Sequence, residues 1–271
     1  LDQTLRVNFR DKDYHFLKDT HIVFPIIIHG ARVYVKVFLL QAETFKTAPL
    51  FLLTTDIPEN DFLAQTISHR LYDPNETTRI AQSILLGVGG AKLLDILQRE
   101  TEIYHMNEGH ALPLCFYLLD KYKNLEDVKK RVVFTTHTPE KAGNEEHSIP
   151  LLNSMSFFNG LTQHEVEDYV YPEDGMLNYT LTALRLAKRA NGVSQLHGEV
   201  ARKMWGDYKG ICEITAITNA QNKTYWLDTD LEKALTENDD VALVARKKEL
   251  KFKLFRTVAN QTGKLFDENI L

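Results

Sequence analysis

The sequence has only two cysteines, Cys115 and Cys212, and neither has a second cysteine close enough to form a Cys-x-x-Cys pair. Both stand among apolar residues, so we interpret them as buried thiols rather than as a disulfide framework or a zinc site. Cysteine use of this kind is typical of a reducing compartment, and we therefore expect a cytoplasmic protein.

The sequence also lacks long apolar runs and any excess of basic residues. No apolar stretch reaches the roughly 20 residues that a membrane-spanning helix needs. The formal net charge is −5, and Lys and Arg are scattered among Asp and Glu, which argues against a nucleic-acid-binding face. We therefore expect no membrane and no nucleic acid among the partners. Because the chain opens with Leu-Asp-Gln-Thr, without an initiator Met or a signal peptide, we interpret it as a piece of a longer protein.

Composition and pattern predict one globular domain that begins with β structure. The chain has 271 residues, of which 44% are hydrophobic and 25% charged, and we predict a single domain over 1–271. Within the β-rich segment 1–56, runs of β-branched and aromatic residues at 22–28 and 32–40 are separated by His29-Gly30-Ala31, which predicts a β-hairpin. A third run stops at the proline that follows it.

Helical periodicity begins near Glu76. Apolar residues recur every three or four positions up to about Gln98 and predict one long helix. Gly87-Val88-Gly89-Gly90 lies inside this pattern, whereas a phosphate-binding glycine loop must follow a strand and open a helix. We therefore interpret these glycines as a place where a neighbouring backbone approaches closely or where the helix bends. Further helical patterns cover 111–122, 178–189 and the helical tail 228–271.

Four later apolar segments each end in polar residues and alternate with the helical patterns. The alternation predicts an α/β fold with a mainly parallel sheet, with the early β runs added as a hairpin. Because the carboxyl ends of parallel strands meet at one edge, where open sheets bind their ligands, we expect a polar crevice there. The segments lie near Ile103, Val133, Val193 and Ile214, and the candidate site residues that follow them are Asn107, Glu108, His110, His137, His197 and Asn219.

The residues of this crevice suit some reactions better than others. His105, Glu108 and His110 have the spacing H-x-x-E-x-H across a strand-to-helix turn, whereas zincins hold their ligands one turn apart on a single helix. Nucleophilic hydrolysis is disfavoured because no Gly-x-Ser-x-Gly string occurs. The remaining interpretation is a neutral polar pocket, whose groups supply the hydrogen bonds that sugar hydroxyls need. Any one of the histidines alone is more often a structural group that bonds a backbone carbonyl.

Five strings of the sequence resemble the α-glucan (glycogen and maltodextrin) phosphorylases, in particular their shorter bacterial branch. They occur in the same order as in that family and lie at 77–82, 86–90, 104–110, 134–139 and 191–199. The resemblance implies the amino-terminal half of a B-type glycosyltransferase fold, in which two Rossmann-like domains face a cleft. It also implies that the full-length protein uses pyridoxal phosphate to transfer a glucosyl unit between an α-1,4-glucan and inorganic phosphate.

Carried over residue by residue, the resemblance implies roles for several candidates. His137 matches the histidine that contacts the sugar at the cleaved bond, and it is the catalytic candidate. Asn219 matches the asparagine that bonds the glucose 6-hydroxyl, while Glu108 and His110 match an acidic residue and a histidine on the glucan side. The other substrate-binding candidates within the matched strings are Asn107 and His197.

Parts of the family pattern are absent from this chain. The family's Ser-Gly-Gly-Leu-Gly loop does not occur, and the lysine that forms the Schiff base with pyridoxal phosphate lies in the family's carboxyl-terminal domain. We therefore expect that missing domain as a partner and expect this chain alone to be inactive, while a homo-oligomer is compatible with the sequence. One residue departs from the pattern, because Ala220 replaces the glycine that follows Asn219. Alanine would strain the loop if the position needs a positive φ.

Three functions therefore stay open. The first is the phosphorylase, for which we expect His137→Ala to lower kcat in the full-length protein and His147→Ala, in the neighbouring loop, to have almost no effect. The second is a non-catalytic α-glucan-binding module, which Ala220 motivates. The third is a nucleotide-sugar glycosyltransferase of the same fold.

Overall fold

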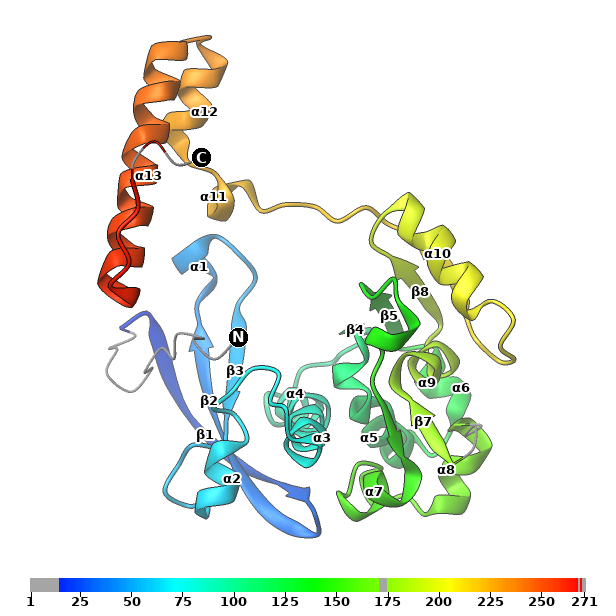
Figure 1. Ribbon diagram of the computed structural model, residues 1–271. Coiled ribbons are helices and arrows are strands. Elements are labelled where there is room, and N and C mark those ends of the chain that lie inside the picture. Colours follow the sequence, from blue (N-terminus) through cyan, green and yellow to red (C-terminus); the bar gives the residue numbers. More distant parts are fainter. Residues whose placement is uncertain (1–14, 171–174, 268, 270–271) are drawn as a thin grey trace. The chain divides into compact units, whose positions relative to one another are not determined.

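The computed structural model describes residues 15–170, 175–267 and 269, and these form two compact units (Figure 1). The larger unit contains Lys18–Leu39 and Leu50–Asn219, and the smaller unit includes Leu40–Pro49 and the residues from Ala220 onward. All candidate site residues belong to the larger unit. The single domain that the sequence predicts over the whole chain stays a prediction.

Four short strands form one parallel sheet in the larger unit. They are β4 (Tyr104–Asn107), β5 (Val132–Thr136), β8 (Arg189–Gly192) and β9 (Glu213–Ala216). Their order across the sheet is β4-β5-β8-β9, and the register places Asn107 beside Thr135 and Thr136 beside Gly192. The carboxyl ends of the strands therefore meet at one edge of the sheet. The α/β fold with a mainly parallel, Rossmann-type sheet is confirmed.

The helices of the larger unit are α2 (Phe62–Thr66), α3 (Glu76–Ile84), α4 (Gly90–Ile96), α5 (Pro113–Tyr122), α6 (Leu125–Lys129), α7 (Ile149–Ser154), α8 (Gln163–Val170), α9 (Tyr179–Leu186) and α10 (Gln195–Trp205). Several cover the parallel sheet, because central strand β5 buries residues on both faces, including Phe134 and Thr135. α6 and α9 pack against β5, and α10 packs against β8 and β9. The helix predicted over 178–189 ends earlier, at Leu186, because Arg189 already pairs with Val133 in the sheet.

The early β segment forms a hairpin, as the sequence predicts, but the hairpin belongs to a sheet of its own (Figure 1). β1 (Leu17–Ile28) and β2 (Ala31–Leu40) are joined by His29 and Gly30, which both have positive φ, and β3 (Leu50–Thr54) pairs with β2. The addition of this hairpin to the central sheet was therefore a wrong expectation. The physical reason is that alternate residues of β1 and β2 are buried and the others are partly or largely exposed, which suits a sheet with one covered face.

The glycine run lies within one long helical segment. α3 continues through a π-helical turn, Leu85–Gly89, into α4. A Cβ atom at Gly87 would lie 2.7 Å from the backbone nitrogen of Leu114 and 2.8 Å from the carbonyl oxygen of Ala111. The glycine thus allows the start of α5 to approach the helix closely, which confirms the interpretation as a packing site rather than a phosphate loop.

The smaller unit is helical among its described residues and contains α1 (Ala42–Phe45), α11 (Lys223–Trp226), α12 (Thr229–Thr236) and α13 (Asp240–Thr262). α12 and α13 pack along each other (Figure 1). Asp228 joins them, because its carboxylate accepts a hydrogen bond from the Leu231 amide at the start of α12 and from the Arg246 guanidinium of α13, at 2.6 Å. None of the helices in the described ranges combines the length and the apolar character that crossing a membrane requires.

Substitution of Gly87 tests the close helix approach. We expect Gly87→Ala to lower the free energy of unfolding by roughly 1 to 3 kcal/mol, because a methyl group would meet the backbone of α5 and force it to move. Gly90→Ala is the matched control, since no atom lies within 4 Å of a Cβ at that position. Urea denaturation of the two variants decides the matter, and equal stabilities would contradict the packing role.

Titration of Asp228 tests the link between α12 and α13. The hydrogen bonds from the Arg246 guanidinium lower the pKa of the Asp228 carboxyl from 3.8 to about 2. Because the pKa is lower in the folded chain than in the unfolded chain, the stabilisation is complete above about pH 4 and is lost as the pH falls toward 2. We expect carboxyl ¹³C NMR to give a midpoint near pH 2, and Arg246→Gln to raise it; a midpoint near pH 4 in the unsubstituted chain would refute the link.

Candidate functional site

A polar cavity of about 360 Å³ lies at the carboxyl edge of the parallel sheet. It is built from the turns that follow β4 and β5, from the start of α9 and from α3. The side chains around it are mostly neutral or paired polar groups, which fits a ligand that forms many hydrogen bonds. The lining residues are Tyr72, Arg79, Glu108, Gly109, His110, His137, Thr138, Gly143, Asn144, Glu145, Tyr179 and Thr180.

Glu108 stands at the end of β4 in an unusual backbone conformation. Its φ is 64° and its ψ is 171°, a combination that is costly for residues other than glycine. The Glu108 amide donates to the Thr135 carbonyl at 2.9 Å, which extends the pairing with β5. The carboxylate oxygen Oε1 accepts hydrogen bonds from the His137 amide and, at 3.1 Å, from the Thr138 hydroxyl. One side chain thus ties the end of β4 to the loop after β5.

His137 and Thr138 form the part of the β5 loop that borders the cavity. The His137 imidazole is exposed, but its main chain is held by Glu108. Pro139 restricts the backbone of Thr138 to extended conformations, which further limits the loop. The main chain at residue 137 therefore has a fixed position beside the cavity.

His110 also lines the cavity, in the turn that leads into α5. Its ring contacts Tyr72 edge-on, with 6.2 Å between the ring centroids. Burial, and next the positive charge of Arg79, lower the pKa of His110 below its ordinary value of 6.5. At neutral pH the imidazole is therefore uncharged and can both donate and accept a hydrogen bond.

A charged cluster forms part of the cavity lining and extends from it to His147 and Glu76. Glu145 forms an ion pair with Arg79 of α3, and its carboxylate lies 3.6 Å from His110 Nδ1 and 3.5 Å from His147 Nε2. His147 belongs to β6 (Glu146–Ser148), which pairs with β7 (Met176–Asn178), and its Nδ1 atom lies 2.8 Å from the carboxylate of Glu76. Among the described lining residues, the single arginine is therefore already paired with a carboxylate.

Little in the sequence pattern predicts this cluster. Arg79 lies in one of the five matched strings, so a residue-by-residue comparison could have drawn attention to it. Glu145 and His147 follow no strand end and carry no motif. The expectation that His147 lies in a loop is wrong, because the residue belongs to β6 and its side chain is buried between Glu76, Glu145 and Tyr179. The expectation that His147→Ala leaves kcat almost unchanged stays a prediction.

The other candidate residues lie outside the cavity lining. Asn107 ends β4 with an exposed side chain. His197 is buried in the first turn of α10, where its Nδ1 atom accepts a hydrogen bond from the Val193 amide at 3.2 Å. The Asn219 side chain is exposed, while its amide donates to the Val193 carbonyl at 3.1 Å. Ala220 has no positive φ, so alanine is not strained there.

Neither the cysteines nor the acidic and histidine side chains offer another reaction centre. Burial raises the pKa of the Cys115 thiol to about 12 and that of Cys212 to about 11, so neither is an activated nucleophile. His105 Nε2 lies 2.7 Å from the Thr135 hydroxyl and so pairs β4 with β5. Within the described ranges, no group of three or more His, Cys, Asp or Glu residues could hold a metal ion.

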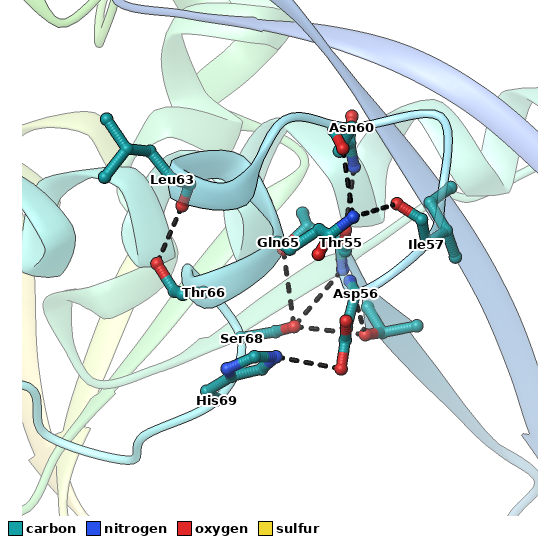
Figure 2. A network of polar contacts seen from close by, with 10 residues as sticks. Thr55, Asp56, Ile57, Asn60, Leu63, Gln65, Thr66, Ser68 and His69 are labelled. Carbon is teal, nitrogen blue, oxygen red and sulfur yellow. Dashed lines mark hydrogen bonds and ion pairs between the residues drawn. The ribbon is translucent and has the colours of Figure 1, made fainter.

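The segment between β3 and α3 contains Tyr72, which lines the cavity. A network of polar contacts holds the part of this segment that precedes Tyr72 in place (Figure 2). Asn60 is buried, and its side-chain amide bonds the backbone of Tyr34 in β2 and the carbonyl of Thr55, at 2.7 Å each. Ser68 bonds Thr55, and His69 lies 2.8 Å from the Asp56 carboxylate. The segment between β3 and α3 is thereby held to the β1-β2-β3 sheet. A second cavity of about 310 Å³ adjoins the first and shares with it Tyr72, Arg79 and His110.

Replacement of His147 tests the charged cluster. We expect His147→Ala to lower the free energy of unfolding by roughly 1 to 3 kcal/mol, because it leaves the buried Glu145 carboxylate with fewer partners and removes the packing against Tyr179. His164→Ala is the control, since His164 is exposed on α8 and should be near neutral. Thermal and urea denaturation measure both, and a neutral His147→Ala would show that the cluster does not stabilise the fold.

Comparison with known proteins gives relatives over almost the whole chain. No family model matches the sequence. An uncharacterized protein of Methanocaldococcus jannaschii is 45% identical over 267 residues, which are 98% of this chain and 50% of that protein. The maltodextrin phosphorylase of Thermococcus litoralis is 31% identical over 231 residues, which are 80% of this chain and 27% of the enzyme. The glycogen phosphorylase of Aquifex aeolicus is 32% identical over 229 residues, which are 78% of this chain and 33% of the enzyme.

The chain thus spans about half the length of the first relative and between about a quarter and a third of the two phosphorylases. Its four-stranded parallel sheet is consistent with a Rossmann-type domain of the B-type glycosyltransferase fold. Over most of its length, the chain is homologous to glycogen and maltodextrin phosphorylases.

Proposed function

We propose that the chain is part of an α-glucan phosphorylase and that the polar cavity at Glu108, His110 and His137 faces the glucan. The full-length protein would transfer a glucosyl unit between an α-1,4-glucan and inorganic phosphate in the cytoplasm. Homology to maltodextrin and glycogen phosphorylases supports the reaction class. The expected partners are the two substrates and the part of the protein that corresponds to the carboxyl-terminal domain of the relatives.

The observation that carries the proposal is the fixed main chain of residue 137 at the edge of a polar, hydroxyl-rich cavity. Glu108 holds this main chain, and uncharged His110 lines the same cavity. Thr138, Asn144 and Thr180 add hydroxyl and amide groups, which donate and accept as sugar hydroxyls do. A carbonyl that is already in place at residue 137 can stabilise positive charge that develops on the sugar, without reorganising during the reaction.

The cavity lining does not fit pyridoxal phosphate. No lysine lines the cavity among the described residues, and Arg79 is paired with Glu145. In the full-length protein, pyridoxal phosphate would therefore be held by groups other than these. The residues of this chain would bind and orient the glucan, with His137 as the catalytic residue and with Glu108 and His110 around it. Asn107, His197 and Asn219 remain proposed as substrate-binding residues, and they lie outside this cavity.

A non-catalytic α-glucan-binding module is the second candidate. The paired state of Arg79 favours it, because the cavity then offers a sugar hydrogen-bond partners but offers phosphate no unpaired arginine or lysine among its described lining residues. A nucleotide-sugar glycosyltransferase would share the sheet architecture, but the homology to phosphorylases supports it less.

The proposal is tested by comparing the phosphorylase activity of this chain with that of the full-length protein. We expect no release of glucose 1-phosphate from maltodextrin and phosphate by this chain, because the groups that handle phosphate are not in its cavity. We expect phosphate-dependent release by the full-length protein in the presence of pyridoxal phosphate. Turnover by the chain alone would contradict the proposal, and a full-length protein that binds maltodextrin without turnover would favour the second candidate.

His137 is tested in the full-length protein. His137→Ala should lower kcat roughly tenfold to hundredfold with little change in KM, because it removes the imidazole that assists the main-chain carbonyl in the transition state, while the carbonyl itself stays. The exposed His164 replaces His147 as the control, and His164→Ala should leave kcat unchanged. Steady-state kinetics with maltodextrin and phosphate provide both values, and equal effects of the two substitutions would remove His137 from the site.

A further inference from the structure

We propose that Glu108 is a positioning residue, which holds the main chain of residue 137 in place and does not itself bind the sugar. The contact that supports this role is observed in the structure, and only its consequence for turnover rests on the proposed function. The role differs from the sequence-based expectation, in which Glu108 is a substrate-binding residue.

The hydrogen bonds that the Glu108 carboxylate accepts come from the loop after β5. Oε1 accepts from the His137 amide and from the Thr138 hydroxyl, so the two contacts lie on either side of the carbonyl group of residue 137. Hydrogen bonds to an ionised carboxylate are stronger than those between neutral groups. The two contacts therefore fix the direction of the 137 carbonyl more firmly than the loop alone would.

The backbone of Glu108 indicates that its side chain has a structural task. Its φ and ψ belong to a region that glycine adopts at low cost and other residues do not. The chain is also pressed onto α9 immediately afterwards, since a Cβ at Gly109 would lie 2.8 Å from the Cβ of Tyr179. The neighbours thus impose the strained turn, and the turn aims the carboxylate at the loop after β5.

Arg79, the positively charged residue of the cavity, does not form its ion pair with Glu108. This residue, the one arginine among the described lining residues, pairs with Glu145 instead. His110 Nδ1 lies 3.6 Å from the Glu145 carboxylate, whereas burial lowers the pKa of His110 and the charge of Glu108 only opposes that fall. The carboxylate of Glu108 therefore finds its partners in the main chain and hydroxyl of the β5 loop, where deletion of the side chain would release residue 137.

Amide hydrogen exchange of this chain, followed by NMR at His137, tests the contact directly. We expect Glu108→Ala to increase the exchange rate of the His137 amide by about tenfold or more, because the amide loses its acceptor. Glu108→Gln should largely preserve the protection, since the side-chain amide oxygen can accept both hydrogen bonds. Glu108→Gly is a second deletion variant that relieves the backbone strain, and it should expose the amide as alanine does. Glu140→Ala, which removes an exposed carboxylate from the same loop, should change nothing.

Kinetics of the full-length protein test the consequence. Glu108→Ala should lower kcat with little change in KM, and Glu108→Gln should restore most of the loss. Unchanged exchange at His137 in both deletion variants would overturn the positioning role. A large rise in KM with unchanged exchange would make Glu108 a sugar-binding residue instead. If the full-length protein has no phosphorylase activity, the proposed function fails, while the exchange result still decides whether Glu108 holds the loop.

Discussion

The hydrogen bonds between the Glu108 carboxylate and the loop at His137 and Thr138 join the carboxyl ends of two neighbouring parallel strands. Backbone hydrogen bonds between neighbouring strands hold a parallel sheet together. The loops that follow the last of these hydrogen bonds are held only by contacts of their own residues. Here one side chain continues the connection by one residue beyond β4 and β5. The cavity depends on this link, because both of the loops that the carboxylate connects line it.

The charged cluster of Arg79, Glu145 and His147 affects the same cavity, because Arg79 and Glu145 belong to its lining. Charges that are largely removed from water need partners, and loss of one partner costs far more than the pair contributes as a whole. Glu145 takes up the positive charge of Arg79, and Glu108 is then the remaining acidic side chain among the described lining residues. Burial keeps His110 uncharged. A lining of hydroxyl, amide and imidazole groups with one carboxylate suits a polar, uncharged ligand such as a sugar better than an anion.

The sequence predicts the sheet and half of the candidate residues for one reason, which is the rule that polar groups at the ends of parallel strands share an edge. Glu108, His110 and His137 follow this rule into the cavity. His197 and Asn219 also follow strands, but their side chains depend on the first turn of α10 and on the backbone beyond β9, and local sequence does not set those directions. Burial of Glu145 against Arg79 could not be foreseen either, because segments far apart in the sequence create it.

The long helix could be predicted from local sequence, whereas the sheet to which the early hairpin belongs depends on contacts between segments far apart in the sequence. The position of the glycine run inside a helical pattern is local information, and it was enough to exclude a phosphate loop. β1, β2 and β3 form a separate sheet because of the elements against which their buried faces pack. The alternation of residues in the sequence indicates only that one face of each strand is buried and does not identify its packing partner.

The most direct test of a glucan-facing cavity is an NMR titration of this chain with maltoheptaose. We expect saturable shifts of the amide signals of Gly109, His137, Thr138 and Thr180, which line the cavity. A β-1,4-linked cello-oligosaccharide of similar length serves as the control and should leave these signals unchanged. Absence of saturable shifts at these residues, or equal shifts with both oligosaccharides, would contradict the assignment of the cavity to an α-1,4-glucan.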